Sequence, residues 1–285
     1  MAVPRIQLYP SGAERSYNKL LQDFVTQLTT ETEKRIRDAN VLRIDGFSED
    51  LTYLLAGMLE FGMLIANPVV FRLPEVYANV NTFNDRQWRL VVKSGTGITI
   101  PPSGAIPNGM VAYGNVSDPT LIRARFGIGI DIYRSEPWLL PRMNNWIDYN
   151  TSLIKSIPTQ YIGKVEAAIR NGVMAGTAPR ELQKEIKRLS GVTSARARLI
   201  SRDQISRANS DLTEYRQLDL GVKEYDWITS NDERVRGNPS GIYPKAVPSH
   251  YAHQGKTYKW SDPPKDTGHP GQSILCRCIA RAKFD

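Results

Sequence analysis

A helical pattern of apolar residues, which begins after Pro158 and stops before Gly221, constrains the fold more than any other feature. The spacing predicts three helices, with a turn at 176–179 between the first two and a C-terminal cap at Gly191 after the second. The third helix is predicted from about Ser194 to Leu218. The apolar faces are Ile162, Val165, Ile169 and Val173, then Leu182, Ile186 and Leu189, then Ala197, Ile200, Ile205, Ala208, Leu212 and Tyr215.

Beyond Gly221 the pattern changes. Alternation over 224–229 predicts a strand, and the remainder is rich in Gly and Pro with no long helix. The sequence therefore predicts an α+β fold: a helical and extended N-terminal region, a helical segment, and a small irregular β-containing C-terminal subdomain.

The N-terminal region is predicted to begin with two helices. Residues 13–45 show helical spacing that stops at Gly46, and Ser48 is placed to cap a second helix. Asn67–Pro68 is predicted to end that helix, because the residue before a proline avoids the α region. Its apolar stretch, 51–66, is shorter than a membrane span and contains Glu60, so we expect no membrane insertion.

Short apolar runs among Pro and Gly follow from Val69 to about Pro119. They predict short strands or extended arms, including Trp88–Val92, and a long loop over 100–109. We accordingly divide the chain into an N-terminal region, 1–150, and a second domain, 151–285.

A surplus of basic residues indicates a polyanionic partner. The 285 residues hold 37 Lys and Arg against 29 Asp and Glu, a net charge of +8. Between Arg180 and Arg216, nine cations and five anions leave +4, half of this surplus. The arginines that we expect to contact the DNA backbone are Arg196, Arg198, Arg202 and Arg207. The alternative is a solvated helix face or ion pairs with carboxylates.

All three His and both Cys lie in the last 36 residues. Such clustering is typical of a small irregular subdomain that a metal stabilises, and two thiolates with two imidazoles would give a tetrahedral zinc site. The alternative is an unligated Cys pair, with Tyr251, Tyr258, Trp260 and Ile274 holding the segment by packing. Two Cys exclude a disulfide framework, and with no signal peptide visible at the N-terminus we expect synthesis in a reducing cytoplasm.

Catalytic patterns are sparse. His250 with Asp232 and Glu233 could imitate a hydrolase or nuclease site. No serine nucleophile elbow, phosphate loop or dinucleotide fingerprint accompanies them, so the sequence favours a protein that is not an enzyme.

The C-terminal half carries an ordered series of motifs. It runs through Gly191-Val192-Thr193, Arg196-Ala197-Arg198, Arg202-Asp203-Gln204, Tyr225, Trp227, Asp232-Glu233-Arg234, His250, Tyr258, Trp260, Pro263-Pro264, His269-Pro270-Gly271 and Cys276-Arg277-Cys278. This series resembles the phage Mu F-like head morphogenesis family, the minor head proteins of tailed phages, over residues of about 150–283. Residues 84–88 and 154–161 resemble N-terminal parts of such proteins.

The resemblance implies a low-copy virion component at or near the portal vertex, made in the bacterial cytoplasm, that assists head assembly and DNA packaging, retention or delivery. It implies the portal protein, other head proteins and double-stranded DNA as partners, with no small-molecule substrate. The region 1–150 is then expected to make the assembly or portal contacts. The alternative is a nuclease-like DNA-processing enzyme at the C-terminal His/Asp cluster.

Two departures from the family bear on these expectations. Many members carry a further Cys pair after the Asp-Glu-Arg motif, where this chain has Arg236-Gly237-Asn238-Pro239. Any zinc would therefore need His250 and His269 beside Cys276 and Cys278, with His253 as a reserve ligand for His250. Some relatives append a toxin domain, which we do not expect here because the sequence ends at Asp285, soon after the last motif.

Overall fold

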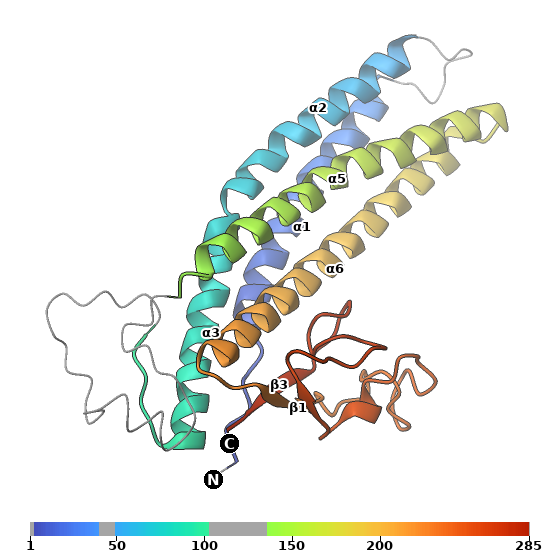
Figure 1. Ribbon diagram of the computed structural model, residues 1–285. Coiled ribbons are helices and arrows are strands. Elements are labelled where there is room, and N and C mark those ends of the chain that lie inside the picture. Colours follow the sequence, from blue (N-terminus) through green and yellow to red (C-terminus); the bar gives the residue numbers. More distant parts are fainter. Residues whose placement is uncertain (1–2, 40–48, 103–135, 285) are drawn as a thin grey trace, which may run out of the picture. The chain divides into compact units, whose positions relative to one another are not determined.

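The computed structural model describes residues 3–39, 49–102 and 136–284, and most of them are helical (Figure 1). The helices are α1 (Ser11–Asp38), α2 (Glu49–Phe71), α3 (Leu73–Thr96), α5 (Leu139–Met174) and α6 (Pro179–Asp219). The remaining elements are β1 (Glu224–Ile228), the short 3-10 helix η2 (Tyr251–His253), β2 (Thr257–Lys259) and β3 (Ile279–Lys283). The predicted α+β class is confirmed.

The chain forms two compact units, each assembled from separate segments. One unit comprises 1–13, 77–143 and 203–285, and the other comprises 14–76 and 144–202. These units do not follow the linear division at residue 150, which remains a prediction about function.

The unit built from 14–76 and 144–202 is a helical bundle. In its interior Tyr17 is buried and donates a hydrogen bond to Asn150 Oδ1 at 2.9 Å. Gly62 on α2 faces Pro158 on α5 so closely that a Cβ at Gly62 would lie 2.6 Å from the proline Cβ. The absence of a side chain at Gly62 therefore allows the two helices to approach at this point.

The other unit contains the sheet that positions the C-terminal His and Cys residues. Strand β1 lies in the centre of a three-stranded antiparallel sheet with the order β2-β1-β3. Tyr225 and Trp227 of β1 are fully buried and share a core cluster with Trp260, Cys276 and Cys278. The strand predicted over 224–229 is thus confirmed, and its alternation places two aromatic rings on the buried face.

The helix boundaries predicted at Pro68, Pro158 and Gly191 are wrong. Helix α2 continues through Pro68 to Phe71, helix α5 begins at Leu139 and continues through Pro158, and α6 runs unbroken through Gly191. In α5, Ile154, Ile157 and Tyr161 are buried at helical spacing on either side of the proline. Burial of such a continuous apolar face offsets the hydrogen bond that a proline removes.

The extended structure predicted after Val69 is also wrong at its start. Residues 73–96 form helix α3, and Trp88–Val92 lies inside it instead of forming a strand. The backbone is non-helical at 98–102, but residues 103–109 of the predicted loop lie outside the described residues.

The helical stretch Leu51–Thr96 is long and apolar enough, by length and composition alone, to cross a membrane. This stretch is longer than the apolar stretch 51–66 considered in the sequence analysis, because α2 does not end before Pro68. Length and composition are weak grounds, since the core helix of a globular protein passes the same test.

Candidate functional site

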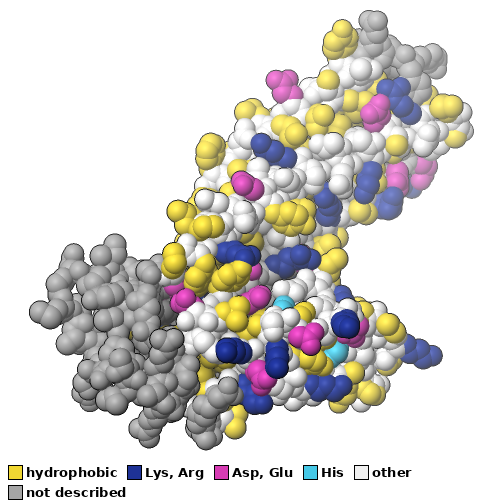
Figure 2. All heavy atoms as spheres, viewed as in Figure 1, with side chains coloured by type: hydrophobic (Ala, Val, Ile, Leu, Met, Phe, Trp, Pro, Cys, Tyr) yellow, Lys and Arg dark blue, Asp and Glu magenta, His cyan; other side chains and the backbone are white. Residues whose placement is uncertain are grey.

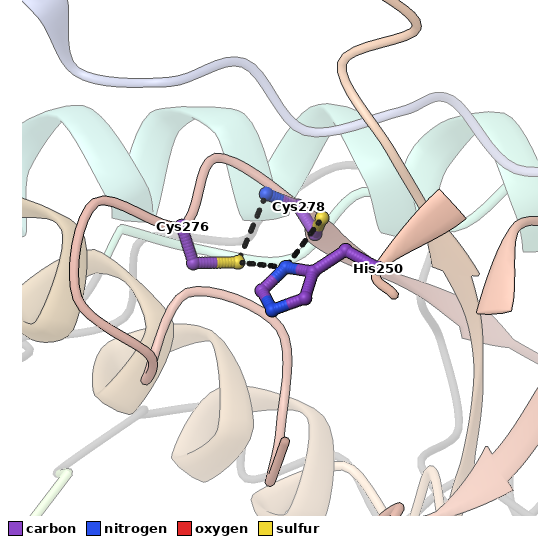
Figure 3. A group of neighbouring side chains, drawn as sticks. All are labelled: His250, Cys276 and Cys278. Carbon is purple, nitrogen blue, oxygen red and sulfur yellow. Dashed lines mark hydrogen bonds between the residues drawn. The ribbon is translucent and has the colours of Figure 1, made fainter. Parts of the chain in front are cut away.

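His250, Cys276 and Cys278 lie together in the sheet-containing unit, with their nitrogen and sulfur atoms pointing toward one another (Figure 3). His250 directly precedes η2, and the two cysteines directly precede β3. His250 Nδ1 lies 3.3 Å from Cys276 Sγ and 3.6 Å from Cys278 Sγ. All three residues are buried, and both cysteines are free thiols.

The backbone around Cys276 is shaped to surround its sulfur with donors. The backbone N–H groups of Gly271 and Cys278 donate to Cys276 Sγ at 3.3 Å and 3.4 Å. Gly271 has a φ of +86°, and a Cβ there would lie 2.8 Å from Ser210 Cβ on α6. Only glycine fits this conformation and this close approach, which explains the glycine of the His-Pro-Gly motif.

The two cysteines have pKa values that are shifted in opposite directions. The hydrogen bond from Cys278 lowers the pKa of Cys276 well below its usual value, with further contributions from His250 and the Gly271 N–H. The same hydrogen bond, together with burial, raises the pKa of Cys278. Cys276 is therefore the sulfur that becomes a thiolate first.

The other two histidines have separate partners. His269 Nδ1 lies 2.9 Å from the Tyr225 hydroxyl, and burial lowers its pKa while a hydrogen bond with the Trp260 backbone opposes the shift. His253 Nδ1 lies 2.6 Å from the Tyr258 hydroxyl, and its Nε2 lies 3.3 Å from Asp266. Of the four predicted metal ligands, the structure thus groups three and leaves His269 outside.

The acid and base groups of the nuclease-like alternative do not form a common site among the described residues. Asp232 forms an ion pair with Arg277, and Glu233 is exposed. Burial raises the pKa of Asp232, but hydrogen bonds from the Arg277 side chain and the Arg234 backbone outweigh it and lower the pKa. His250 is directed to the cysteines instead.

The predicted DNA-contacting arginines lie on α6 in different surroundings. Arg198 is exposed and Arg202 is partly exposed. Arg196 donates to the Ser156 hydroxyl at 2.8 Å, and Arg207 forms an ion pair with Asp203 at 2.9 Å. On the face shown in Figure 2, Lys and Arg side chains are interspersed with acidic and apolar ones and do not merge into one patch.

Several other cations of the segment 180–216 are engaged in ion pairs. Lys184 and Arg188 pair with Glu181 and Glu185 one helical turn away. Arg216 is fully buried, where it forms an ion pair with Glu136. With Arg207, at least four of the nine cations therefore have an acidic partner, as expected if these cations form ion pairs with carboxylates.

Sequence reasoning missed Thr267 and Ser273, whose hydroxyls are the next contacts around His250. Thr267 Oγ1 lies 2.9 Å from His250 Nε2 and 3.0 Å from Ser273 Oγ. Single polar residues in an irregular segment carry no periodic pattern, and only the fold brings them beside His250.

Comparison with known proteins identifies the part of the chain that contains this site. Residues 163–281 match the family described as phage Mu protein F like protein. Over this segment the chain is similar to the phage Mu F-like family. The resemblance read from the sequence is thereby confirmed, and the family is one of phage head morphogenesis proteins.

A bacterial protein is similar to part of this chain. A protein of Haemophilus influenzae, described as uncharacterized, is 35% identical over 179 residues, which are 61% of this chain. This chain spans only 38% of that protein's length. No solved structure matches the chain.

Proposed function

We propose that this Mu F-like protein is a minor head component of a tailed phage, located at or near the portal vertex. There it assists head assembly and the packaging, retention or delivery of DNA. The observation that carries the proposal is the family match over 163–281, which includes all of α6, strands β1 and β2, and the first three residues of β3. Head morphogenesis proteins act together with other head components, and the portal and the genome are the proposed partners.

The proposed association with heads has a direct test. Particles purified from a lysate should contain the protein at a low copy number relative to the major shell protein. Empty heads that have not packaged DNA should contain it too, because assembly precedes packaging. A protein found free in the lysate and absent from both kinds of particle would overturn the proposal.

The proposed DNA contact rests on the net charge of +8 and on the exposed side of α6 that carries Arg198 and Arg202. These arginines are four residues apart and project from one helical face. Contact with phosphates releases counterions, so affinity for duplex DNA should fall steeply as salt rises and should not depend on base sequence.

Charge reversal at both arginines, R198E with R202E, should lower the slope of log affinity against log salt by about 2. The matched control is K184E with R188E, which changes the net charge equally at positions whose cations are paired with glutamates. Equal effects of the two double variants, or binding that does not respond to salt, would contradict a contact at Arg198 and Arg202.

A further inference from the structure

Two partly buried hydroxyls beside His250, those of Thr267 and Ser273, have hydrogen bonds that determine which ring nitrogen of His250 donates. Ser273 Oγ donates to the Thr267 backbone carbonyl at 2.9 Å, so its proton is committed. The Thr267 hydroxyl then donates to Ser273 Oγ at 3.0 Å and accepts a hydrogen bond from His250 Nε2–H at 2.9 Å. In the form that binds a metal, His250 would carry its proton on Nε2, and the lone pair of Nδ1 would be directed toward the two sulfurs.

The separations of these atoms agree with a tetrahedral zinc site. With Zn–S of about 2.3 Å and Zn–N of about 2.0–2.1 Å, tetrahedral angles place a ligand nitrogen about 3.6 Å from each sulfur and the sulfurs about 3.8 Å apart. The observed distances from His250 Nδ1 are 3.3 Å and 3.6 Å, and all three donor atoms lie within 4.8 Å of one another. The donors are already arranged around a common point.

We propose that His250 Nδ1, Cys276 Sγ and Cys278 Sγ bind one zinc ion. Two thiolates and one imidazole are the soft and borderline donors that zinc prefers. Each sulfur binds as a thiolate, so binding releases to solvent any proton that the cysteine pair holds. The backbone N–H donors of Gly271 and Cys278 support the negative charge on Cys276 Sγ.

His269 and His253 are not ligands in this proposal, because both nitrogens of each ring have other partners. For His269 these are the Tyr225 hydroxyl and the Trp260 backbone. For His253 they are the Tyr258 hydroxyl and Asp266. Among the described residues no further His, Cys, Asp or Glu joins the three, so the fourth position would be open to water.

The zinc ion has a structural role in this account. No carboxylate oxygen belongs to the group in the described part of the chain, so no general base is placed beside a metal-bound water. Between β1 and β3 the described chain has only a three-residue strand and one short 3-10 helix. A zinc ion would link the residue before η2 to the residues before β3 and hold this irregular segment closed.

Thr267 is a positioning residue, since it touches His250 and not the metal. A hydrogen bond to the second ring nitrogen fixes the orientation of a ligating histidine. Replacing Thr267 with Val removes the hydroxyl and keeps the shape, and should weaken zinc binding by roughly 10- to 100-fold. Replacing it with Ser keeps the hydroxyl and should restore affinity.

The first experiment measures zinc in the full chain, purified without chelator, by elemental analysis. We expect one zinc per chain, lost in H250N, C276S and C278S and retained in the matched controls H253N and H269N. A folded wild-type chain without zinc, which also fails to take up added Zn²⁺, would overturn the proposal. Loss of zinc in H269N to the same extent as in H250N would overturn the ligand set.

The second experiment remains informative even if the ligand variants do not fold. Co²⁺ added to the metal-free wild-type chain should produce a near-ultraviolet thiolate-to-cobalt charge-transfer band, which Zn²⁺ then displaces. Competition with a chelator gives the affinities of T267V and T267S. A wild-type chain without the band, or T267V with wild-type affinity, would contradict the proposed site.

Discussion

The buried ion pair between Arg216 and Glu136 gives the sharpest test of how the sheet-containing unit is stabilised. Both side chains are 1% exposed, and the guanidinium donates to both carboxylate oxygens at 2.9 Å. The same guanidinium donates to Asn81 Oδ1 and Asn84 Oδ1 at 2.6 Å each. The arginine thus provides hydrogen bonds to the buried Glu136 and Asn84 and to the partly buried Asn81.

Replacing Arg216 with Met should leave the Glu136 carboxylate buried without a counter-charge. Removing one partner of a buried pair typically costs about 3–5 kcal/mol in the free energy of unfolding. With a urea m-value of about 3 kcal/mol per M, the unfolding midpoint should fall by about 1–1.7 M. The double variant, R216M with E136Q, should recover much of this loss because no charge remains buried.

The matched control is R188M, in the same helix, whose ion pair with Glu185 is exposed. Exposed pairs contribute little, so the midpoint of R188M should stay close to that of the wild-type chain. The assay is urea unfolding followed by circular dichroism and by tryptophan fluorescence. If R216M unfolds at the same urea concentration as R188M, the argument from burial is refuted.

Two further predictions concern the segment between β2 and β3. The change G271A should lower the free energy of unfolding by about 1–3 kcal/mol more than G255A does, as measured by chemical denaturation. Both glycines have a positive φ, but only Gly271 lies against Ser210. Burial lowers the pKa of His269 below its ordinary value of 6.5. As the pH falls below 6.5, the unfolded state therefore binds a proton at this residue before the folded state does, and the free energy of unfolding decreases. The free energy of unfolding should therefore decrease less between pH 7.5 and pH 5.5 in H269N than in the wild-type chain, and parallel pH profiles would show that His269 does not contribute.

The sequence predicted those parts of the fold where one periodic pattern was uninterrupted. Strand β1 followed from the alternation of Tyr225 and Trp227 with polar residues, and the two parts of α6 on either side of Gly191 followed from apolar residues at helical spacing. Helix α3 was missed because polar Asn84 and Asp85 are buried within its apolar face. Asn84 donates to Asn209 and Thr213 on α6, and such compensation by a distant helix leaves no local signal.

Prolines and glycines misled the prediction of helix boundaries. Pro68 and Pro158 lie inside helices, and Gly191 lies inside α6, because tertiary burial outweighs the local preference of these residues. Strand β3 was not predicted, since its buried residues, Ala280 and Ala282, have small side chains with low strand propensity.

The candidate site was predicted in part for a similar reason. Clustering of His and Cys along the chain pointed to the C-terminal segment, and His250, Cys276 and Cys278 are indeed together. Sequence spacing could not separate the three histidines, because their roles depend on contacts with Tyr225, Tyr258 and Thr267. The count of cations on α6 could not reveal that Arg216 is buried in an ion pair.

The position of the protein in intact phage particles tests the central claim most directly. Cross-linking of purified virions followed by mass spectrometry would identify the neighbours of the Mu F-like segment. We expect cross-links from lysines of this protein to the portal protein, at a low copy number per particle. Cross-links confined to the major shell protein, at a copy number matching that of the shell, would contradict a role at the portal vertex.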